Sequence, residues 1–176
     1  MRDSATSSLR QRRVRNAPSR IVIDGDAAQI EVSLDGTSTI IDAEDVPLVL
    51  GIKWSHSKGY VRPSPSRANA GVPLLHRLIA QVSDPAVRVD HIDGNRANNA
   101  IANLRDVTRS VNHQNLRRAR SDSAHGFLGV SPFFGKWKAR ITVNRVFQHL
   151  GVFDTPEEAH AAYLEAKRRL HVGCTI

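Results

Sequence analysis

The feature that most constrains the fold is a sequence of two strand patterns and one capped helix in the centre of the chain. Val87–Val89 is rich in β-branched residues, and Leu104–Val107 repeats this pattern after an Asn-rich stretch long enough for an extended hairpin loop. Thr108 is a good N-cap residue, which predicts a helix over Arg109–Arg118. The order strand, strand, helix predicts a small mixed unit.

Polar groups suited to phosphodiester cleavage stand where these elements meet. This reaction needs a base that activates water and a cation that neutralises developing charge. His91 can be the base because an imidazole titrates near neutral pH, whereas Asp90 and Asn112 offer the hard oxygen ligands that Mg²⁺ prefers. Adjacent strand residues point to opposite faces, so Asp90 and His91 can serve one site only if the strand ends or bulges there, which Gly94 nearby allows.

The order of these motifs resembles the His-Asn-His (HNH) nuclease family, in the branch where Asp-His replaces the first pair and Asn replaces the last His. The resemblance implies a ββα-metal module, with Mg²⁺ or Mn²⁺ held by Asp90 and Asn112. It also implies that His91 is the catalytic base, and that Asn103 is catalytic by bracing the loop and helping to orient that base. The motifs that carry the resemblance are Leu75-His76-Arg77-Leu78-Ile79, Val89-Asp90-His91-Ile92-Asp93-Gly94-Asn95, Asn103-Leu104-Arg105 and Thr108-Arg109-Ser110-Val111-Asn112.

Simpler interpretations exist for single residues of this set. Asp90-His91 alone is a common dipeptide, and the residues after it favour a polar turn. His76 is expected to pack or hydrogen-bond structurally, and His113 to face DNA or solvent. Many family members have a further ligand where this chain has Leu116, so the resemblance implies a metal site with two protein ligands, completed by water and phosphate.

The charge of the chain favours a nucleic-acid partner. Twenty-five Lys and Arg against seventeen Asp and Glu give a net charge of +8. The charge is uneven: +5 over residues 1–20, −5 over 21–60 and +4 over 105–120. The positive segment 105–120 includes the predicted helix, which predicts phosphate contacts with double-stranded DNA. The residues expected to make these contacts are Arg105, Arg109, Arg117 and Arg118.

The C-terminal third predicts a three-stranded antiparallel sheet that packs on one helix. Strand patterns occupy residues 126–130, 135–141 and 149–155. Thr155, Pro156 and Glu158 form the N-cap, first position and capping-box partner of a helix. An apolar stripe continues through that helix, and Gly173 lies beyond its end; the stripe consists of Ala159, Ala162, Tyr163, Ala166 and Leu170.

Alternation in the middle strand predicts an exposed basic face. Trp137, Ala139, Ile141 and Val143 share the face that should pack on the helix. The other face, with its flanking positions, is expected to bind DNA, and includes Lys136, Lys138, Arg140, Thr142, Arg145 and His149. Motifs such as Gly-Lys-Trp-x-Ala-x-Ile and Leu-Gly-x-Phe-Asp-Thr resemble the plant Apetala/ethylene-response-factor domain, which inserts its sheet into the major groove. Ser131 and Pro132 stand where that family usually has arginines, so the recognised sequence does not follow.

The remaining chain predicts a small β-meander and two connecting segments. Strand patterns occur at 21–23, 30–34 and 39–41, separated by Gly and Asp. The expected division of this α+β chain is a basic disordered tail (1–20), an N-terminal β-rich segment (21–74), a central module (75–120), a tether (121–125) and a C-terminal module (126–173).

Cysteine content and hydropathy exclude disulfide-linked, zinc-knuckle and membrane-spanning proteins from the classes considered for this chain. A single cysteine, Cys174, excludes an internal disulfide and a Cys-built zinc knuckle, and it fits a reducing cytoplasm. No apolar run approaches the roughly 18–20 residues of a membrane span. No membrane association and no required protein partner are expected.

These features together predict a metal-dependent DNA endonuclease that resembles phage or intron-encoded HNH homing enzymes. A chain with one active site is expected to nick one strand when monomeric. Two alternatives remain open: a sequence-specific DNA-binding regulator with a degenerate nuclease domain, and an accessory nuclease of phage DNA packaging. The C-terminal module favours homing over packaging.

Overall fold

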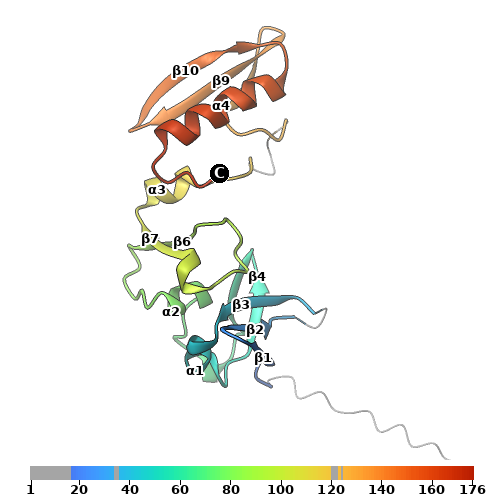
Figure 1. Cartoon of the computed structure of the whole chain (residues 1–176), viewed down its shortest axis with the longest axis vertical. Coiled ribbons are helices and arrows are strands. Elements are labelled where there is room, and N and C mark those ends of the chain that lie inside the picture. Colours follow the sequence, from blue (N-terminus) through green and yellow to red (C-terminus); the bar gives the residue numbers. More distant parts are fainter. Residues whose placement is uncertain (1–16, 34–35, 120–122, 124) are drawn as a thin grey trace, which may run out of the picture.

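The computed structural model describes residues 17–33, 36–119, 123 and 125–176, and it has an α+β fold of small antiparallel sheets. Most of the expected tail (residues 1–16) and of the expected tether (121, 122 and 124) therefore lies outside the described residues. The described elements follow one another along the long axis: the N-terminal sheet lies at one end, the central hairpin and helix in the middle, and the C-terminal sheet at the other end (Figure 1).

The N-terminal segment begins with the expected antiparallel meander, in strand order β1-β2-β3. Its strands are β1 (Ile21–Asp24), β2 (Ala27–Glu31) and β3 (Ser38–Asp42). The middle strand lies three residues earlier than the predicted 30–34. The cause is a two-residue turn, since Asp24 pairs with Ala27 and Gly25 has a φ of 58°.

The rest of this segment is a series of short elements that leads to the central module. They are the 3-10 turn η1 (Ala43–Asp45), helix α1 (Val46–Val49), the hairpin β4 (Trp54–Ser57) and β5 (Tyr60–Pro63), the 3-10 turn η2 (Arg67–Asn69) and helix α2 (Leu75–Ile79). Trp54 is fully buried and donates from Nε1 to the carbonyl of Val49, 3.3 Å away.

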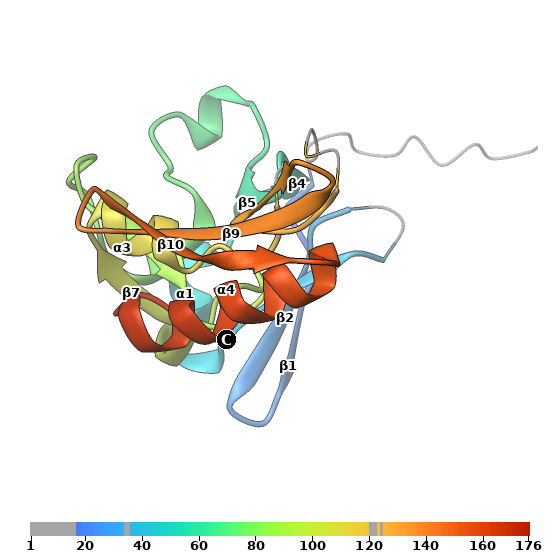
Figure 2. The same ribbon diagram turned by 90° about the horizontal axis from the view of Figure 1, so that it is seen from above.

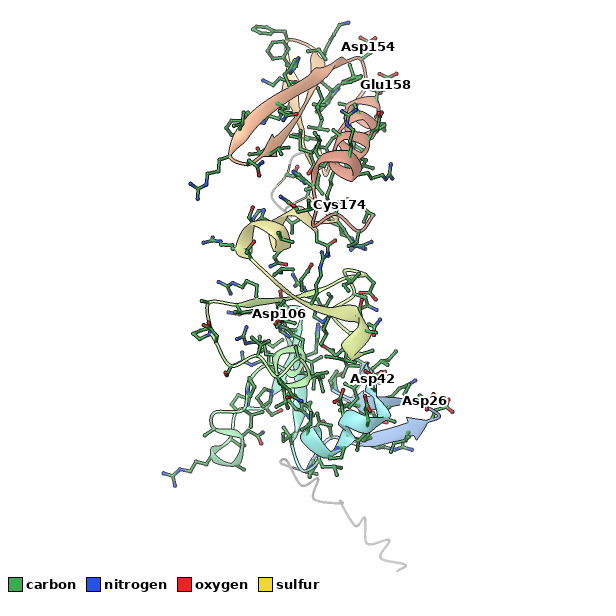
Figure 3. The ribbon with its side chains drawn as sticks, turned by 60° about the vertical axis from the view of Figure 1, so that its left-hand side comes forward. Asp26, Asp42, Asp106, Asp154, Glu158 and Cys174 are labelled. Carbon is green, nitrogen blue, oxygen red and sulfur yellow. The ribbon has the colours of Figure 1, made fainter. Side chains whose placement is uncertain are left out.

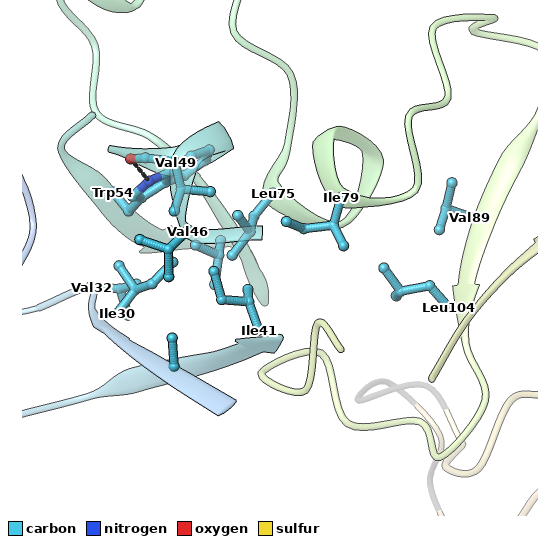
Figure 4. Close-up of a cluster of buried hydrophobic side chains, with 12 residues drawn as sticks. Ile30, Val32, Ile41, Val46, Val49, Trp54, Leu75, Ile79, Val89 and Leu104 are labelled. Carbon is cyan, nitrogen blue, oxygen red and sulfur yellow. Dashed lines mark hydrogen bonds between the residues drawn. The ribbon is translucent and has the colours of Figure 1, made fainter. Parts of the chain in front are cut away.

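One hydrophobic core joins the N-terminal segment to the central module (Figure 4). The N-terminal segment contributes Ile30, Ile41 and Trp54 to this core. The central module contributes Leu75, Ile79, Val89 and Leu104. Burial of apolar surface therefore holds the central hairpin on the N-terminal scaffold.

The central module contains the predicted strand, strand and helix. The elements are β6 (Arg88–His91), the 3-10 turn η3 (Ile101–Asn103), β7 (Leu104–Val107) and α3 (Arg109–Gln114). The Thr108 side chain accepts a hydrogen bond from Val111 N, as expected of an N-cap. The helix is shorter than the predicted 109–118 because it ends at Asn115, whose side chain bonds back to the end of β6.

The C-terminal module is an antiparallel sheet in the order β10-β9-β8, with one helix across one of its faces (Figure 2). Its elements are β8 (Val130–Phe133), β9 (Lys136–Val143), β10 (Val146–Phe153) and α4 (Pro156–Leu170). Ala139 and Ile141 are buried, whereas Arg140 and Thr142 are exposed, so the predicted alternation in the middle strand is confirmed. The capping box of Thr155 and Glu158 is also present.

Two strand starts in this module differ from prediction by three residues or more, and left-handed backbone explains both. The first strand starts at Val130 and not at Gly126, since Gly126 and Gly129 have φ values of 70° and 73°. The third strand starts at Val146, because Asn144 and Arg145 adopt positive φ and form a tight turn after β9.

The segment after α4 returns to the central module, and Cys174 marks it in Figure 3. Gly173 N lies 3.0 Å from Gln114 Oε1 at the end of α3. A Cβ at Gly173 would come within 2.4 Å of the Val111 carbonyl, so this close approach requires glycine. Across the described part of the chain, no helix is long and apolar enough to cross a bilayer.

Candidate active site

The end of strand β6 places Asp90 and His91 beside a cavity of about 740 Å³. Asp90 pairs with Arg105 of β7 and His91 with Leu104, after which the strand ends. Both side chains are buried, and they have different partners. Asp90 contacts Asn115 at the end of α3, whereas His91 contacts the loop residue Asn99 and His76 of α2. Both residues nevertheless line the cavity, together with Asn112.

A chain of hydrogen bonds defines the tautomer of His91. Thr39 Oγ1 donates to the Ala97 carbonyl, so its oxygen accepts from Asn99 Nδ2, 2.7 Å away. Asn99 Nδ2 also lies 3.3 Å from the carbonyl of Arg96, which requires the same amide orientation. Asn99 Oδ1 therefore faces His91 Nε2 at 3.1 Å and accepts a hydrogen bond from the Nε2 N–H. The lone pair that can accept a proton is consequently on Nδ1.

Burial keeps this imidazole neutral. It lowers the pKa of His91 below 6.5, while the hydrogen bond to Asn99 and the charges of Asp93 and Asp90 oppose the shift only in part. At pH 7 the ring is therefore in the unprotonated state that a general base requires.

The carboxylate of Asp90 is held through one of its two oxygens. Oδ2 accepts from Arg105 Nη2 at 2.9 Å, Arg105 Nε at 3.2 Å and Asn115 Nδ2 at 3.0 Å. Within the described part of the chain, all hydrogen bonds to this carboxylate go to Oδ2, so Oδ1 is available for another ligand. Arg105, predicted from the sequence to contact DNA, here forms an ion pair with Asp90 and a hydrogen bond to the carbonyl of Gly173.

The donor set around the cavity fits a hard divalent cation. No group of three or more His, Cys, Asp and Glu side chains that could hold a metal occurs among the described residues. Both oxygens of Asp93, the other carboxylate that lines the cavity, already accept hydrogen bonds. A metal here would therefore be held by the Asp90 carboxylate and by the carboxamide oxygen of the half-buried Asn112. Oxygen ligands of this kind suit Mg²⁺ or Mn²⁺, which keep several waters when bound.

Asn103 bonds to the loop after His91 and not, among the described residues, to the His91 side chain. Its Nδ2 donates to Asp93 Oδ1 at 2.9 Å and to the carbonyl of Asn98 at 2.8 Å, and its Oδ1 accepts from Asp93 N at 3.0 Å. These bonds brace the loop after His91. The bond to the base comes from Asn99, because the loop turns Asn99 inward against β3. Burial raises the pKa of Asp93, but its hydrogen bonds from Asn98, Asn95 and Asn103 outweigh this and lower it.

Basic residues surround the cavity. Arg96, Arg117 and Arg118 line it, with the exposed His113. The Arg96 guanidinium lies 4.2 Å from the ring centre of Tyr60. Arg117 donates to the carbonyls of Ile92 and Thr175, whereas Arg109 is exposed on α3. Arg96 was not singled out from the sequence, where it is one of many isolated arginines.

His76 packs in the wall of the site. Its ring centre lies 5.3 Å from those of both Tyr60 and His91, and the residue is only 6% exposed. Burial, together with the positive charges of neighbouring residues, lowers the pKa of His76 to about 4. This packing role agrees with the structural interpretation of His76.

The pKa of His76 predicts a loss of stability in mild acid. The unfolded chain takes up a proton near pH 6.5, but the folded chain resists protonation until about pH 4. The free energy of unfolding should therefore have its full value above pH 6.5. It should fall by about 2–3 kcal/mol as the pH drops toward 4. Denaturant unfolding at pH 7 and 4.5 measures this loss, and His76→Phe should remove most of it. An equal loss in both proteins would contradict the assignment.

The six residues predicted to read DNA belong to the C-terminal sheet and its turns, away from the cavity-lining residues. Arg140 pairs with His149, and both are exposed. Lys138 Nζ lies 4.8 Å from the ring centre of Phe133, and the Arg140 guanidinium 5.4 Å from that of Phe147. Lys136 forms an exposed ion pair with Asp154, and Arg145 lies in the β9–β10 turn.

Comparison with known proteins places the site in a family context. Residues 74–114, which contain α2, β6, β7 and α3, match the family model described as HNH endonuclease. The chain is also similar to a protein of Acanthamoeba polyphaga mimivirus named as an uncharacterized HNH endonuclease. The two are 31% identical over 134 residues, which cover 73% of this chain and 67% of the relative. No solved structure matches the chain.

Proposed function

This chain belongs to the HNH endonuclease family and is a nuclease, and we propose that it is a metal-dependent enzyme that nicks double-stranded DNA in the manner of homing endonucleases. One observation carries the proposal. His91 is a neutral base with Nδ1 available, beside an Asp90 oxygen that has no hydrogen bond among the described residues, at a cavity lined by arginines.

In the proposed reaction, His91 activates water. Nδ1 takes a proton from the water while the water oxygen bonds to phosphorus. The bond from phosphorus to the leaving sugar oxygen breaks. The leaving oxygen takes a proton from solvent, and His91 later returns its own proton to solvent. Asn99 holds the Nε2 proton throughout, so that the ring keeps the orientation and tautomer that the first transfer needs.

Asp90 Oδ1 and the carboxamide oxygen of Asn112 would hold Mg²⁺ or Mn²⁺ in a ββα-metal arrangement built from β6, β7 and α3. When bound, the cation would neutralise charge on the phosphorane and on the leaving oxygen. Arg105 and Asn115 keep the Asp90 carboxylate in place through Oδ2. We therefore assign Arg105 to positioning Asp90 and assign phosphate contact to Arg96, Arg109, Arg117 and Arg118.

We further propose that the exposed face of β8–β10 reads DNA in the manner of the Apetala-type domain that it resembles. Lys138, Arg140 and Thr142 form its centre, and Lys136, Arg145 and His149 flank it. A nuclease module joined to a DNA-binding module acts at a higher effective concentration near the bound DNA site. The proposed setting is the cytoplasm of a host cell, which the single Cys174 suits.

Two substitutions on this face separate recognition from affinity. Arg140→Ala should relax sequence preference by about 1–3 kcal/mol at one base position, because arginine reads guanine bidentately. Lys138→Ala should weaken binding to all sequences alike. It should also reduce the slope of the logarithm of the binding constant against the logarithm of salt concentration by about one, because one phosphate contact is lost. Site selection with the full chain, made inactive by His91→Ala, measures both. Unchanged affinity and preference in Arg140→Ala would remove this face from recognition.

Incubation with supercoiled plasmid and Mg²⁺ tests the proposed activity. Nicked circles should accumulate before linear DNA, and EDTA should stop the reaction. Site-specific binding without cleavage would favour the regulator with a degenerate nuclease domain. Cleavage that appears only with a packaging complex would favour the accessory role.

A further inference from the structure

The segment that follows α4 packs against residues that line the nuclease site, among them Asn115 and Arg117. Residues 171–176 run from the end of α4 to α3 and the end of β6. Arg105 Nη2 donates to the carbonyl of Gly173 at 2.8 Å while it also holds Asp90. The C-terminal module is thus bonded to a residue that positions the proposed metal ligand.

Thr175 makes the most direct of these connections. Its hydroxyl lies 2.6 Å from Asn115 Oδ1 and 2.5 Å from the carbonyl of Ile92. Arg117 Nη2 lies 2.7 Å from the same hydroxyl oxygen. Since Arg117 can only donate, the hydroxyl accepts from Arg117. The Ile92 carbonyl already accepts from Arg117 Nη2 at 3.0 Å, so we assign the single hydroxyl proton to Asn115 Oδ1.

The orientation of the Asn115 amide follows from its other partners. Nδ2 lies 3.0 Å from Asp90 Oδ2 and 3.0 Å from the carbonyl of His91. Both partners are acceptors, so the amide nitrogen must face them and Oδ1 must face Thr175. Asn115 is 6% exposed, and the Thr175 hydroxyl is the donor that satisfies its oxygen among the described residues.

We propose that Thr175 is a positioning residue of the nuclease site, which acts through Asn115 to hold Asp90 and the backbone of His91. The inference rests on the proposed metal-dependent cleavage. Loss of the hydroxyl leaves a buried amide oxygen without a donor, and the amide then gains by turning away to find one. Asp90 would lose the Asn115 hydrogen bond and keep only Arg105. The segment that follows the module predicted to read DNA therefore also supports the site proposed to cut it.

A second contact supports the same coupling between modules. Lys167 of α4 is 1% exposed, and its ammonium donates to the carbonyl of Leu116, just beyond α3. A buried lysine is stable only when it is hydrogen-bonded. The contact holds α4 beside the segment that carries Asn115 and Arg117, so the position of Thr175 does not depend on its own bonds alone.

The test compares Thr175→Val, which removes the hydroxyl at nearly constant volume, with Thr175→Ser, which keeps it. Removal of an outer partner of a metal ligand typically lowers activity or metal affinity by about 10–100-fold. We expect kcat for plasmid nicking to fall by at least about tenfold in Thr175→Val, with unchanged KM, at a temperature where the variant is fully folded. Thr175→Ser should retain wild-type kcat. Val172→Ala is the matched control, because Val172 lies in the same segment and is 84% exposed.

Titration calorimetry with Mg²⁺ alone gives a readout that does not depend on cleavage. Affinity for Mg²⁺ should fall in Thr175→Val and not in Thr175→Ser or Val172→Ala. A double-mutant cycle completes the test: in an Asn115→Ala background, Thr175→Val should cause no further loss, because the two residues act in series. If Thr175→Val is unstable, Thr175→Ala takes its place as the variant that lacks the hydroxyl.

Three results would overturn the inference: wild-type kcat and Mg²⁺ affinity in Thr175→Val, losses that Thr175→Ser shares, or additive losses in the double variant. If the wild-type protein binds Mg²⁺ but nicks no DNA, the proposed function fails. The calorimetric comparison then still decides the role of Thr175.

Discussion

His91→Ala should lose at least about a hundredfold in nicking rate, because a positioned general base typically contributes 10²–10⁴-fold. DNA affinity should not change, since the base acts on water and does not anchor the substrate. Single-turnover nicking of supercoiled plasmid measures the first effect, and gel-shift titration in EDTA measures the second.

The control for this substitution is His56→Ala. His56 is an exposed histidine on β4, outside the residues that line the cavity. It should cleave like the wild-type protein. Full nicking by His91→Ala would exclude His91 from the mechanism, and a parallel loss of DNA affinity would assign it to substrate binding.

Asp90→Asn should abolish measurable nicking at physiological Mg²⁺ and weaken Mg²⁺ binding at least about tenfold, because the carboxylate is the one charged ligand of the proposed site. Asparagine keeps the shape of the side chain and a carbonyl oxygen that Arg105 can still reach, so the hairpin should remain folded. Titration calorimetry with Mg²⁺ and circular dichroism measure the two quantities.

Asp106→Asn is the matched control. Asp106 lies on the same hairpin, but its side chain is exposed (Figure 3). The same charge is removed there without a change to the site, so Mg²⁺ affinity and nicking should stay at wild-type values. Equal losses in both variants would mean that net charge, and not a ligand at Asp90, governs metal binding.

Features that depend on residues close together in the sequence were predicted more accurately than features that depend on distant residues. The strands around the Asp90-His91 pair, the N-cap at Thr108, the capping box at Thr155 and the alternation of β9 were predicted correctly. Each of these depends on residues a few positions apart, whose spacing the sequence displays directly. Boundaries failed where a turn needed positive φ, as at Asn144 and Arg145, or where tertiary contacts ended a helix, as at Asn115.

The hydrogen-bond partners of the proposed catalytic groups lay beyond that range. Asn99 and Asn103 stand in the same Asn-rich run, and nothing local distinguishes the one that bonds to His91. The choice is made by Thr39, 60 positions away in β3, which fixes the Asn99 amide.

The sequence by itself therefore determined the family, the order of elements, and which residues could be base and metal ligand. These properties reside in short motifs and local periodicity. Only the tertiary structure decided which asparagine holds the base, that Arg105 serves Asp90, and that Thr175 reaches Ile92 across 83 positions. Such contacts are selected when distant segments pack around a common core and each buried polar group must find a partner there.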